Sequence, residues 1–285
     1  MRYESPQTIK AAVGLLSKAR GTSRILAGGT DLLVQMRSGM LEPDLIVDIK
    51  NIPGMFDITK EKDGYRIGAA VSGAELGEHP KVKELWPGVV EATELIGSTQ
   101  IQGRATMVGN LCNASPAADS VPAMIAARAV ARVVGPKRAR NVAVEDIAIA
   151  PGKTSLKKGE FVASVFLPKP KRRTGEAYLR FIPRTEMDIA VVGAGVSLTL
   201  NTKGVCSDAR VSLGAVAARA LVVDDAADAL IGTKVDKAAL DELAAICAAA
   251  AKPIDDKRGT KEFRIKVAGV LARRAAAIAL KRAKG

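Results

Sequence analysis

The sequence predicts an α+β protein built from more than one lobe, and three observations support this. The chain has 285 residues, about twice the commonest domain size of 100 to 150 residues, so several lobes are expected. Short apolar strand candidates alternate with glycine turns and helical patterns in its first half. In the last third, alternating strands at 189–200 and 209–214 precede long alanine-rich helices, a pattern typical of an antiparallel sheet backed by helices.

Residues 1–54 are predicted to form a small N-terminal α/β lobe. Apolar residues recur at helical spacing in its first helix, and a glycine turn separates its first strand from its second helix. In chain order, the predicted elements are a helix at 6–19, a strand at 24–27, a glycine turn at 28–31, a helix at 32–37, a strand at 45–49 and a final turn at 51–54.

A larger second lobe is predicted over residues 55–170, and a C-terminal domain over residues 171–285. The basic segment 168–173 contains two prolines and is the expected linker between them. In the second lobe we expect a strand at 65–71, a long helical region through Ile96, a glycine-marked stretch at 97–110, an alanine-rich helix at 121–131 and strands at 131–134 and 160–167. In the C-terminal domain we expect a turn at 201–204 between the two strands and helices at 236–251 and 262–283.

Composition excludes several classes of protein. Hydrophobic residues make up 48% and charged residues 26% of the chain, values that are ordinary for a globular protein and argue against disorder. No run of about 18 apolar residues occurs, so no membrane span is predicted. The first twenty residues carry five charged side chains and lack the apolar core of a signal peptide. We therefore expect a cytoplasmic location.

The chain has too few histidines and cysteines to build a metal site. Cys112, Cys206 and Cys247 lie far apart, so they give neither a CxxC pair nor a disulfide framework. The single histidine, His79, is followed by Pro80 and is predicted to lie on an exposed turn. Structural zinc and iron–sulfur sites need about four ligands. We therefore predict no metal-binding and no catalytic residues in this chain.

The net charge of +13 is concentrated in two segments. Residues 153–184 hold nine Lys or Arg and two Glu, and residues 252–285 hold eleven Lys or Arg and three acidic residues. Nucleic-acid binding is disfavoured, because aromatic residues make up only 3% of the chain and no zinc-finger or RNP1-type motif is present. Docking of acidic partner subunits, or attraction of an anionic ligand, is the favoured interpretation.

The turn Gly28-Gly29-Thr30-Asp31 is the first candidate site. It lies between a predicted strand and a predicted helix, where unpaired backbone N–H groups and the positive helix end favour an anion such as phosphate. Adjacent glycines allow close backbone approach, and Thr30 adds a hydroxyl. The alternative is that the turn only begins the helix. Neither a GxGxxG fingerprint nor a P-loop occurs in the chain.

A second candidate site lies at 106–110 and continues through 115–120. Hydroxyl, amide, carboxylate and glycine groups come together there in fifteen residues, within Thr106-Met107-Val108-Gly109-Asn110 and Ser115-Pro116-Ala117-Ala118-Asp119-Ser120. The alternative is an irregular loop in which Asp119 or Ser120 caps the next helix.

Together these segments resemble a known family, the FAD-binding medium subunits of the molybdenum hydroxylases, which include xanthine dehydrogenase and carbon monoxide dehydrogenase. Ala27 to Leu32 is similar to the first pyrophosphate loop of that family, and Ile96 to Ile101 followed by Thr106 to Asn110 is similar to the second. Ser115 to Asp119 resembles the segment whose Asp contacts the flavin nucleotide. Arg184 to Ala190 resembles an R-x-x-x-D-x-A pattern of relatives, so the resemblance extends over nearly the whole chain.

Two departures from the family pattern accompany this resemblance. Val108 stands where the second loop of relatives has the first of two glycines, so only Gly109 permits unhindered backbone approach. Gln102-Gly103 stands where relatives often carry Arg-Asn.

The resemblance implies a flavoprotein fold of the vanillyl-alcohol-oxidase/PCMH type, with FAD held non-covalently between the first two lobes. The implied cofactor-binding residues are Ala27, Gly28, Gly29, Thr30, Asp31, Leu32, Ile96, Ile101, Thr106, Gly109, Asn110, Ser115, Asp119, Val162 and Arg180. Arg180 is included because relatives carry a basic residue at its position, where a cation would lie near the flavin.

The function implied by the resemblance is that of an oxidoreductase subunit in a larger molybdenum hydroxylase. A large subunit with the molybdenum cofactor would oxidise the substrate, and a small [2Fe–2S] subunit would relay the electrons. The FAD of this chain would pass them to an external acceptor, in a dimer of heterotrimers without nucleic acid or membrane contact. Two alternatives stay open: a basic interaction or nucleic-acid-binding protein with purely structural glycine loops, and a stand-alone flavin oxidase of the same fold.

Overall fold

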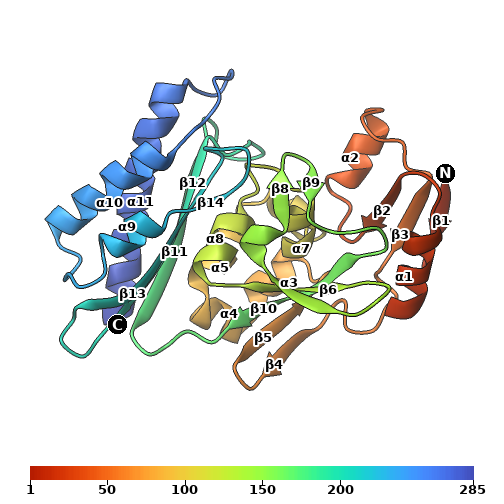
Figure 1. Ribbon diagram of the computed structural model, residues 1–285, viewed down its shortest axis with the longest axis horizontal. Helices are drawn as coiled ribbons and strands as arrows, with labels where there is room; N and C mark the ends of the chain where they lie inside the picture. The colour runs from red at the N-terminus through yellow and green to blue at the C-terminus, as the bar shows by residue number, and fades with distance from the viewer.

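The computed structural model describes residues 1–285 of the chain. Figure 1 shows three regions side by side along the longest axis: the N-terminal lobe at the right, a middle lobe, and a C-terminal sheet with its helices at the left. Each region has one main β-sheet, and a fourth, two-stranded sheet accompanies the middle lobe. No helix combines the length and the apolar character needed to cross a membrane. The predicted α+β class is confirmed.

The N-terminal lobe is a parallel three-stranded sheet with two helices. Its elements are β1 (Arg2–Glu4), α1 (Ile9–Lys18), β2 (Ser23–Leu26), α2 (Leu32–Arg37) and β3 (Leu45–Asp48), with β3 in the centre of the sheet. Strand β1 was not predicted from the sequence. The first helix begins at Ile9 rather than at residue 6, because the Thr8 hydroxyl accepts a hydrogen bond from Ala11 N at 3.1 Å and caps it.

The middle lobe is built on an antiparallel five-stranded sheet in the order β4-β5-β10-β6-β7. Its strands are β4 (Ile58–Glu61), β5 (Gly64–Gly68), β6 (Val130–Val134), β7 (Arg140–Ala143) and β10 (Phe161–Pro168). The short elements η1 (Val144–Asp146), β8 (Ala148–Ala150) and β9 (Lys153–Thr154) lie between β7 and β10 in the chain. Strand β10 is central, so Val165 and Leu167 are fully buried.

Six helices connect β5 to β6. They are α3 (Gly73–Glu78), α4 (Pro80–Leu85), α5 (Pro87–Glu94), α6 (Thr99–Gln102), α7 (Met107–Cys112) and α8 (Ser120–Ala126). The expectation of one long helical region through Ile96 is wrong, because Pro80 and Pro87 each begin a new helix and cannot continue the previous one. Helix α8 ends earlier than predicted, because Arg128 adopts a φ of 56° and the chain turns into β6.

His79 lies in the turn between α3 and α4, but its ring is half-buried rather than exposed as expected. The ring Nδ1 accepts a hydrogen bond from Val82 N at 3.3 Å, and the ring packs edge-on against Tyr65. His79 therefore caps α4, which is a structural role.

The C-terminal domain is an antiparallel four-stranded sheet covered by helices on both faces. Its strands are β11 (Thr174–Phe181), β12 (Val192–Leu200), β13 (Cys206–Gly214) and β14 (Leu221–Val222), and its helices are α9 (Asp224–Asp228), α10 (Lys237–Ala250) and α11 (Lys261–Lys284). Figure 1 shows α10 and α11 on the outer face of this sheet, with α5 and α8 of the middle lobe on its inner face. The predicted sheet backed by helices is confirmed.

Two hydrophobic cores hold the molecule together. One core of 39 buried residues extends through the N-terminal and middle lobes and includes Tyr178 of β11, and a second core of 28 buried residues lies between the C-terminal sheet and its outer helices. The first two lobes therefore pack as one unit. The domain boundaries at residues 54 and 170 stay predictions.

Candidate functional site

A cavity of about 840 Å³ lies between the N-terminal and middle lobes. This volume is at the upper end of the range found for small-molecule sites. The two sequence-predicted loops meet at its walls, together with apolar residues of β10. The predicted site residues that line it are Ala27, Gly28, Gly29, Thr30, Asp31, Leu32, Ile96, Thr106, Gly109, Asn110, Ser115 and Val162.

The first loop, Ala27 to Leu32, requires glycine at both of its central positions. A Cβ on Gly28 would lie 1.9 Å from the carbonyl oxygen of Arg104, so the two lobes approach each other backbone to backbone here. Gly29 has a φ of 81°, which side-chain-bearing residues rarely adopt. None of the N–H groups of Gly28 to Leu32 donates to a backbone carbonyl of the chain. The loop therefore lines the cavity with backbone donors that have no backbone acceptor.

The second loop, Thr106 to Asn110, begins helix α7. The Thr106 hydroxyl accepts a hydrogen bond from Gly109 N at 2.8 Å, while the N–H groups of Thr106 and Val108 donate to no backbone carbonyl. Val108 is buried in the first hydrophobic core, so the fold accommodates a valine side chain at this position of the loop. This loop adds two further backbone donors, on Thr106 and Val108, at the same cavity.

Asn110 fixes the segment that follows the second loop. Its Oδ1 accepts hydrogen bonds from Ser120 Oγ at 2.7 Å and from Ser120 N at 3.2 Å, which ties the start of α8 to α7. Ser115 Oγ accepts a hydrogen bond from Ala117 N at 3.3 Å. Ser115 and Asn110 are thus held at the cavity wall by contacts with their own segment.

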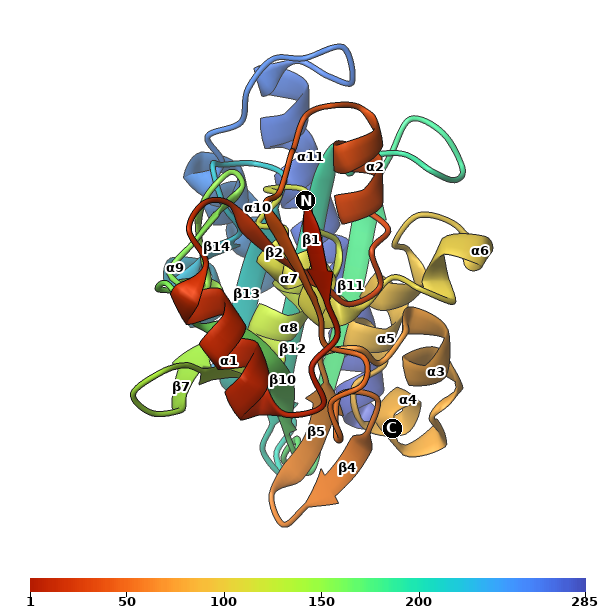
Figure 2. The same cartoon turned by 90° about the vertical axis from the view of Figure 1, so that its right-hand side faces the viewer.

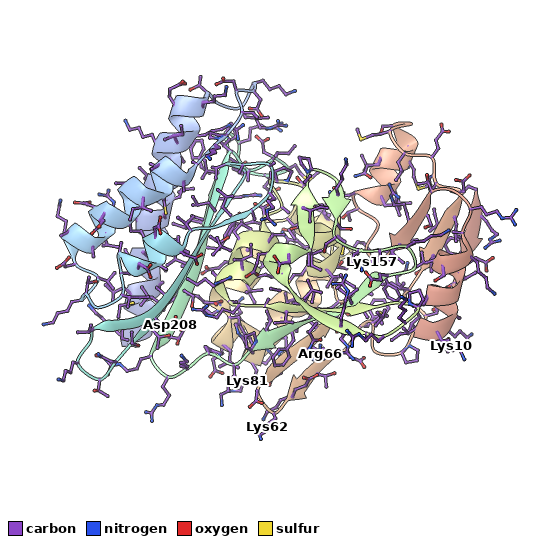
Figure 3. All side chains as sticks on the ribbon, viewed as in Figure 1. Lys10, Lys62, Arg66, Lys81, Lys157 and Asp208 are labelled. Carbon is purple, nitrogen blue, oxygen red and sulfur yellow. The ribbon has the colours of Figure 1, made fainter.

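Positive charge lies at the cavity edge. Lys157 and Lys158 line it and are exposed, on a loop that approaches α1 so closely that a Cβ on Gly159 would lie 2.3 Å from Ser17 Oγ. Figure 3 places Lys157 where the middle lobe faces the N-terminal lobe. Glu160 also lines the cavity, but its carboxylate is paired with Arg140 at 2.8 Å. The cavity edge therefore favours an anionic ligand.

Three predicted site residues do not line the cavity: Ile101, Asp119 and Arg180. Ile101 packs beneath Gly97, where a Cβ would lie 2.7 Å from Ile101 Cγ2, so it supports the turn that carries Ile96. Asp119 and Arg180 form a buried ion pair, with Arg180 Nη1 donating to Asp119 Oδ2 at 2.8 Å.

The ion pair belongs to a buried cluster with Tyr178, whose hydroxyl donates to Asp119 Oδ1 at 3.1 Å. Burial raises the pKa of Asp119 to about 6, although Arg180 and Tyr178 oppose this shift. Burial and the nearby Asp119 raise the pKa of Tyr178. The Arg180 side chain is only 4% exposed, and its Nε has no hydrogen-bond partner. A buried donor without a partner is available to an acceptor on a ligand.

Several residues at the site were not predicted from the sequence. Lys157 and Lys158 belong to the basic segment 153–184, so the charge distribution could have indicated them. Gln35 and Asn113 line the cavity from opposite lobes and share a hydrogen bond of 3.1 Å, but no local pattern marks either one. Tyr178 reaches Asp119 across 59 residues of sequence, which local patterns cannot indicate.

The residues present fit a ligand such as FAD. Unpaired backbone donors and a glycine cradle suit a pyrophosphate, the exposed lysines suit its charge, and Ile96 and Val162 supply apolar wall for a flat ring system. No group of three or more His, Cys, Asp or Glu side chains has the geometry to hold a metal ion.

Comparison with known proteins agrees with this geometry. Residues 1–170 match the family model of the FAD-binding domain in molybdopterin dehydrogenase, and residues 177–279 match that of the C-terminal domain of CO dehydrogenase flavoprotein. The carbon monoxide dehydrogenase medium chain of Afipia carboxidovorans is 34% identical over 282 residues, which are 99% of this chain and 97% of that protein.

Two further comparisons extend over nearly the full length. The xanthine dehydrogenase FAD-binding subunit of Escherichia coli O157:H7 is 30% identical over 265 residues, covering 92% of this chain and 90% of that protein. A solved structure of reconstituted CO dehydrogenase from Oligotropha carboxidovorans contains a chain that superposes with a TM-score of 0.94 at 34% identity, covering 99% of this chain and 98% of that one. This chain therefore belongs to the family of FAD-binding medium subunits of the molybdenum hydroxylases.

Proposed function

We propose that this chain holds FAD non-covalently in the cavity between its first two lobes and passes electrons to an external acceptor as one subunit of a larger enzyme. The electrons would come from a small [2Fe–2S] subunit, and the substrate would be oxidised on a large molybdenum subunit. Support for the assembly comes from relatives that are named as the medium chain of carbon monoxide dehydrogenase. We also propose a dimer of heterotrimers in the cytoplasm.

The observation that carries the proposal is the meeting of the two loops at one cavity. Backbone N–H groups of Gly28 to Leu32 and those of Thr106 and Val108 are unpaired within the backbone, so they can donate to the pyrophosphate oxygens. Lys157 and Lys158 lie at the edge of the same cavity. Bound FAD supplies the redox chemistry through its isoalloxazine ring, and this chain supplies binding and orientation.

The buried cluster of Asp119, Tyr178 and Arg180 would set the charge beside the ring. Asp119 follows Ser115 in a segment that begins at the cavity wall, and Arg180 pairs with Asp119 behind that segment. Because the cluster is shielded from water, its charges act through a low dielectric and have a strong effect on a nearby group.

Non-covalent attachment is supported by the state of the cysteine at the cavity. Cys112 lines the cavity, and burial raises the pKa of its thiol to about 12. A protonated thiol is a poor nucleophile. We expect acid precipitation of the purified yellow chain to release all of the flavin into the supernatant, at about one FAD per chain. A yellow pellet would contradict non-covalent binding, and a colourless chain that ignores added FAD would favour the basic interaction protein.

Reconstitution with partner subunits tests the electron-transfer role. The chain loaded with FAD should leave an aldehyde, a purine and a CoA thioester unoxidised, and should reduce an added dye only when the iron–sulfur and molybdenum subunits are present. Turnover of one of these substrates by the isolated chain, at rates like those of the full complex, would instead establish a stand-alone flavin oxidase.

A further inference from the structure

Helix α2 borders the cavity but is poorly anchored to the rest of the molecule. Leu32 and Gln35 line the cavity, yet no residue of α2 is buried, and Leu33 and Val34 are 52% and 64% exposed. No other helix or strand packs extensively against it. Figure 1 shows α2 at the top of the N-terminal lobe, and in Figure 2, which faces that lobe, α2 lies on the side toward the viewer. A segment with so few buried contacts opens at low free-energy cost.

Both ends of α2 carry glycines that can act as hinges. Gly29 precedes the helix with a φ of 81°, and Gly39 follows it with a φ of 71° and no atom within 4 Å of the place of its missing Cβ. Met40 directly follows Gly39, is 77% exposed and lines the cavity. Glycines permit the backbone rotations that a hinged movement requires.

One side-chain hydrogen bond joins α2 to the middle lobe. Gln35 Nε2 donates to Asn113 Oδ1 at 3.1 Å, and both residues line the cavity. Asn113 follows the last residue of α7 and is held there, because its backbone N–H donates to Gly109 O at 2.9 Å. The bond therefore connects a weakly packed element to a fixed one across the cavity.

We propose that α2 is a lid over the FAD cavity, held closed by the hydrogen bond between Gln35 and Asn113. The inference rests on the proposed function, because it takes FAD as the ligand of this cavity. Opening about the two glycine hinges admits and releases the cofactor, and the bond slows release. Gln35 and Asn113 are thus residues that retain FAD.

A double-mutant cycle on FAD release tests the lid. A hydrogen bond of this kind changes an equilibrium by about 2- to 12-fold, so Gln35→Ala and Asn113→Ala should each speed FAD release by about that factor. Because both variants lose the same bond, the double variant should be no faster than the faster single variant. Release is followed by the recovery of flavin fluorescence after dilution. Gln7→Ala, an exposed residue outside the cavity, is the control.

If the fold-changes in release rate of the two single variants multiply in the double variant, each residue contacts FAD separately. If the release rates of the variants equal that of the wild type, the hydrogen bond does not slow release. Either result overturns the lid while leaving FAD binding intact. A wild-type chain that binds no FAD would instead overturn the proposed function.

Hydrogen exchange of the chain without FAD supplies a readout independent of the cofactor. Asn113→Ala should accelerate amide exchange in residues 32–41, although the substituted residue belongs to the other lobe. Exchange in β10 should stay at the wild-type rate. Equal exchange rates of residues 32–41 in Asn113→Ala and wild type would contradict the proposal, because the hydrogen bond between Gln35 and Asn113 would then not keep α2 closed.

Discussion

The first glycine loop and the buried cluster of Asp119, Tyr178 and Arg180 differ in the atoms that carry their chemistry. The loop presents backbone N–H groups and owes its shape to Gly28 and Gly29. The cluster is formed by charged and hydroxyl side chains that are buried together. Backbone donors need only a permitted turn, whereas a buried charge needs a partner to offset its desolvation. Substitutions should therefore act on ligand binding at the loop and mainly on stability at the cluster.

Arg180→Ala should have the largest effect, because it leaves the Asp119 carboxyl buried without its cation. We expect a loss of about 3–5 kcal/mol in the free energy of unfolding, measured by urea denaturation of the chain without FAD. Asp119→Asn combined with Arg180→Met removes both charges and should be less destabilising than Arg180→Ala alone. A double variant as unstable as the single one would show that packing, rather than charge, dominates this cluster.

The same two residues should shift the midpoint potential of bound FAD in opposite directions. Removing the cation in Arg180→Ala should lower the potential, and removing the carboxylate in Asp119→Asn should raise it, because a positive charge favours added electrons. A spectroelectrochemical titration measures both. Unchanged potentials in the two variants would place the cluster too far from the ring to matter.

Glu176 of β11 combines both kinds of chemistry, because backbone N–H groups donate to a carboxylate side chain that is buried. Its Oε1 accepts hydrogen bonds from Gly88 N at 3.1 Å and Val89 N at 3.3 Å, and Glu91 and Arg282 lie nearby. Burial is the largest influence and raises the pKa of Glu176 to about 8, with Glu91 adding to the shift and Arg282 opposing it.

The folded chain therefore keeps the Glu176 proton up to about pH 8, whereas the unfolded chain loses it above about pH 4.5. The contribution of this group to the free energy of unfolding is complete below pH 4.5 and decreases as the pH rises toward 8, by about 4 kcal/mol. Denaturation between pH 5 and 8 should show a shallower decrease for Glu176→Gln than for wild type. Identical slopes in the two proteins would mean that Glu176 does not titrate in this range.

Local sequence patterns predicted the loop but not the cluster. Gly28 to Asp31 are neighbours in the chain, so a strand, a turn and a helix in succession were enough to place the donors. Asp119 belonged to the second candidate site, but Arg180, 61 residues away, became a candidate only through the family resemblance. Tyr178 was not identified, because nothing near it in the sequence indicates that it faces Asp119.

The secondary structure shows the same difference between features set by local sequence and features set by distant contacts. The long helices α10 and α11 were predicted almost to their ends because their alanine-rich patterns are long and uninterrupted. Strand β1, with three residues, was not predicted because its pairing with β3 depends on a segment more than forty residues away. Short elements depend on distant contacts, and such contacts leave no local pattern.

Gly28→Val tests whether the loop acts through backbone access. Its side chain would collide with the Arg104 carbonyl, and a steric cost of about 1–3 kcal/mol corresponds to roughly 5- to 150-fold weaker FAD binding. Fluorescence titration with FAD measures the affinity, and urea denaturation of the same variant shows whether it folds. Gly14→Val is the matched control, because no atom lies within 4 Å of a Cβ at that position in α1. Wild-type affinity in folded Gly28→Val would mean that the loop is only a helix start.

Asp31→Asn should have the smallest effect, because Asp31 contributes through charge rather than through shape. It precedes α2 without making a side-chain capping hydrogen bond, and it is exposed. A carboxylate at a helix start contributes about 0.3–1 kcal/mol, so removing its charge should change FAD affinity by less than about 5-fold. The same titration compares it directly with Gly28→Val. If Asp31→Asn weakened binding as much as Gly28→Val, the side chain of Asp31 would itself contact the cofactor, and the contrast between a loop of backbone donors and a cluster of side chains would no longer hold.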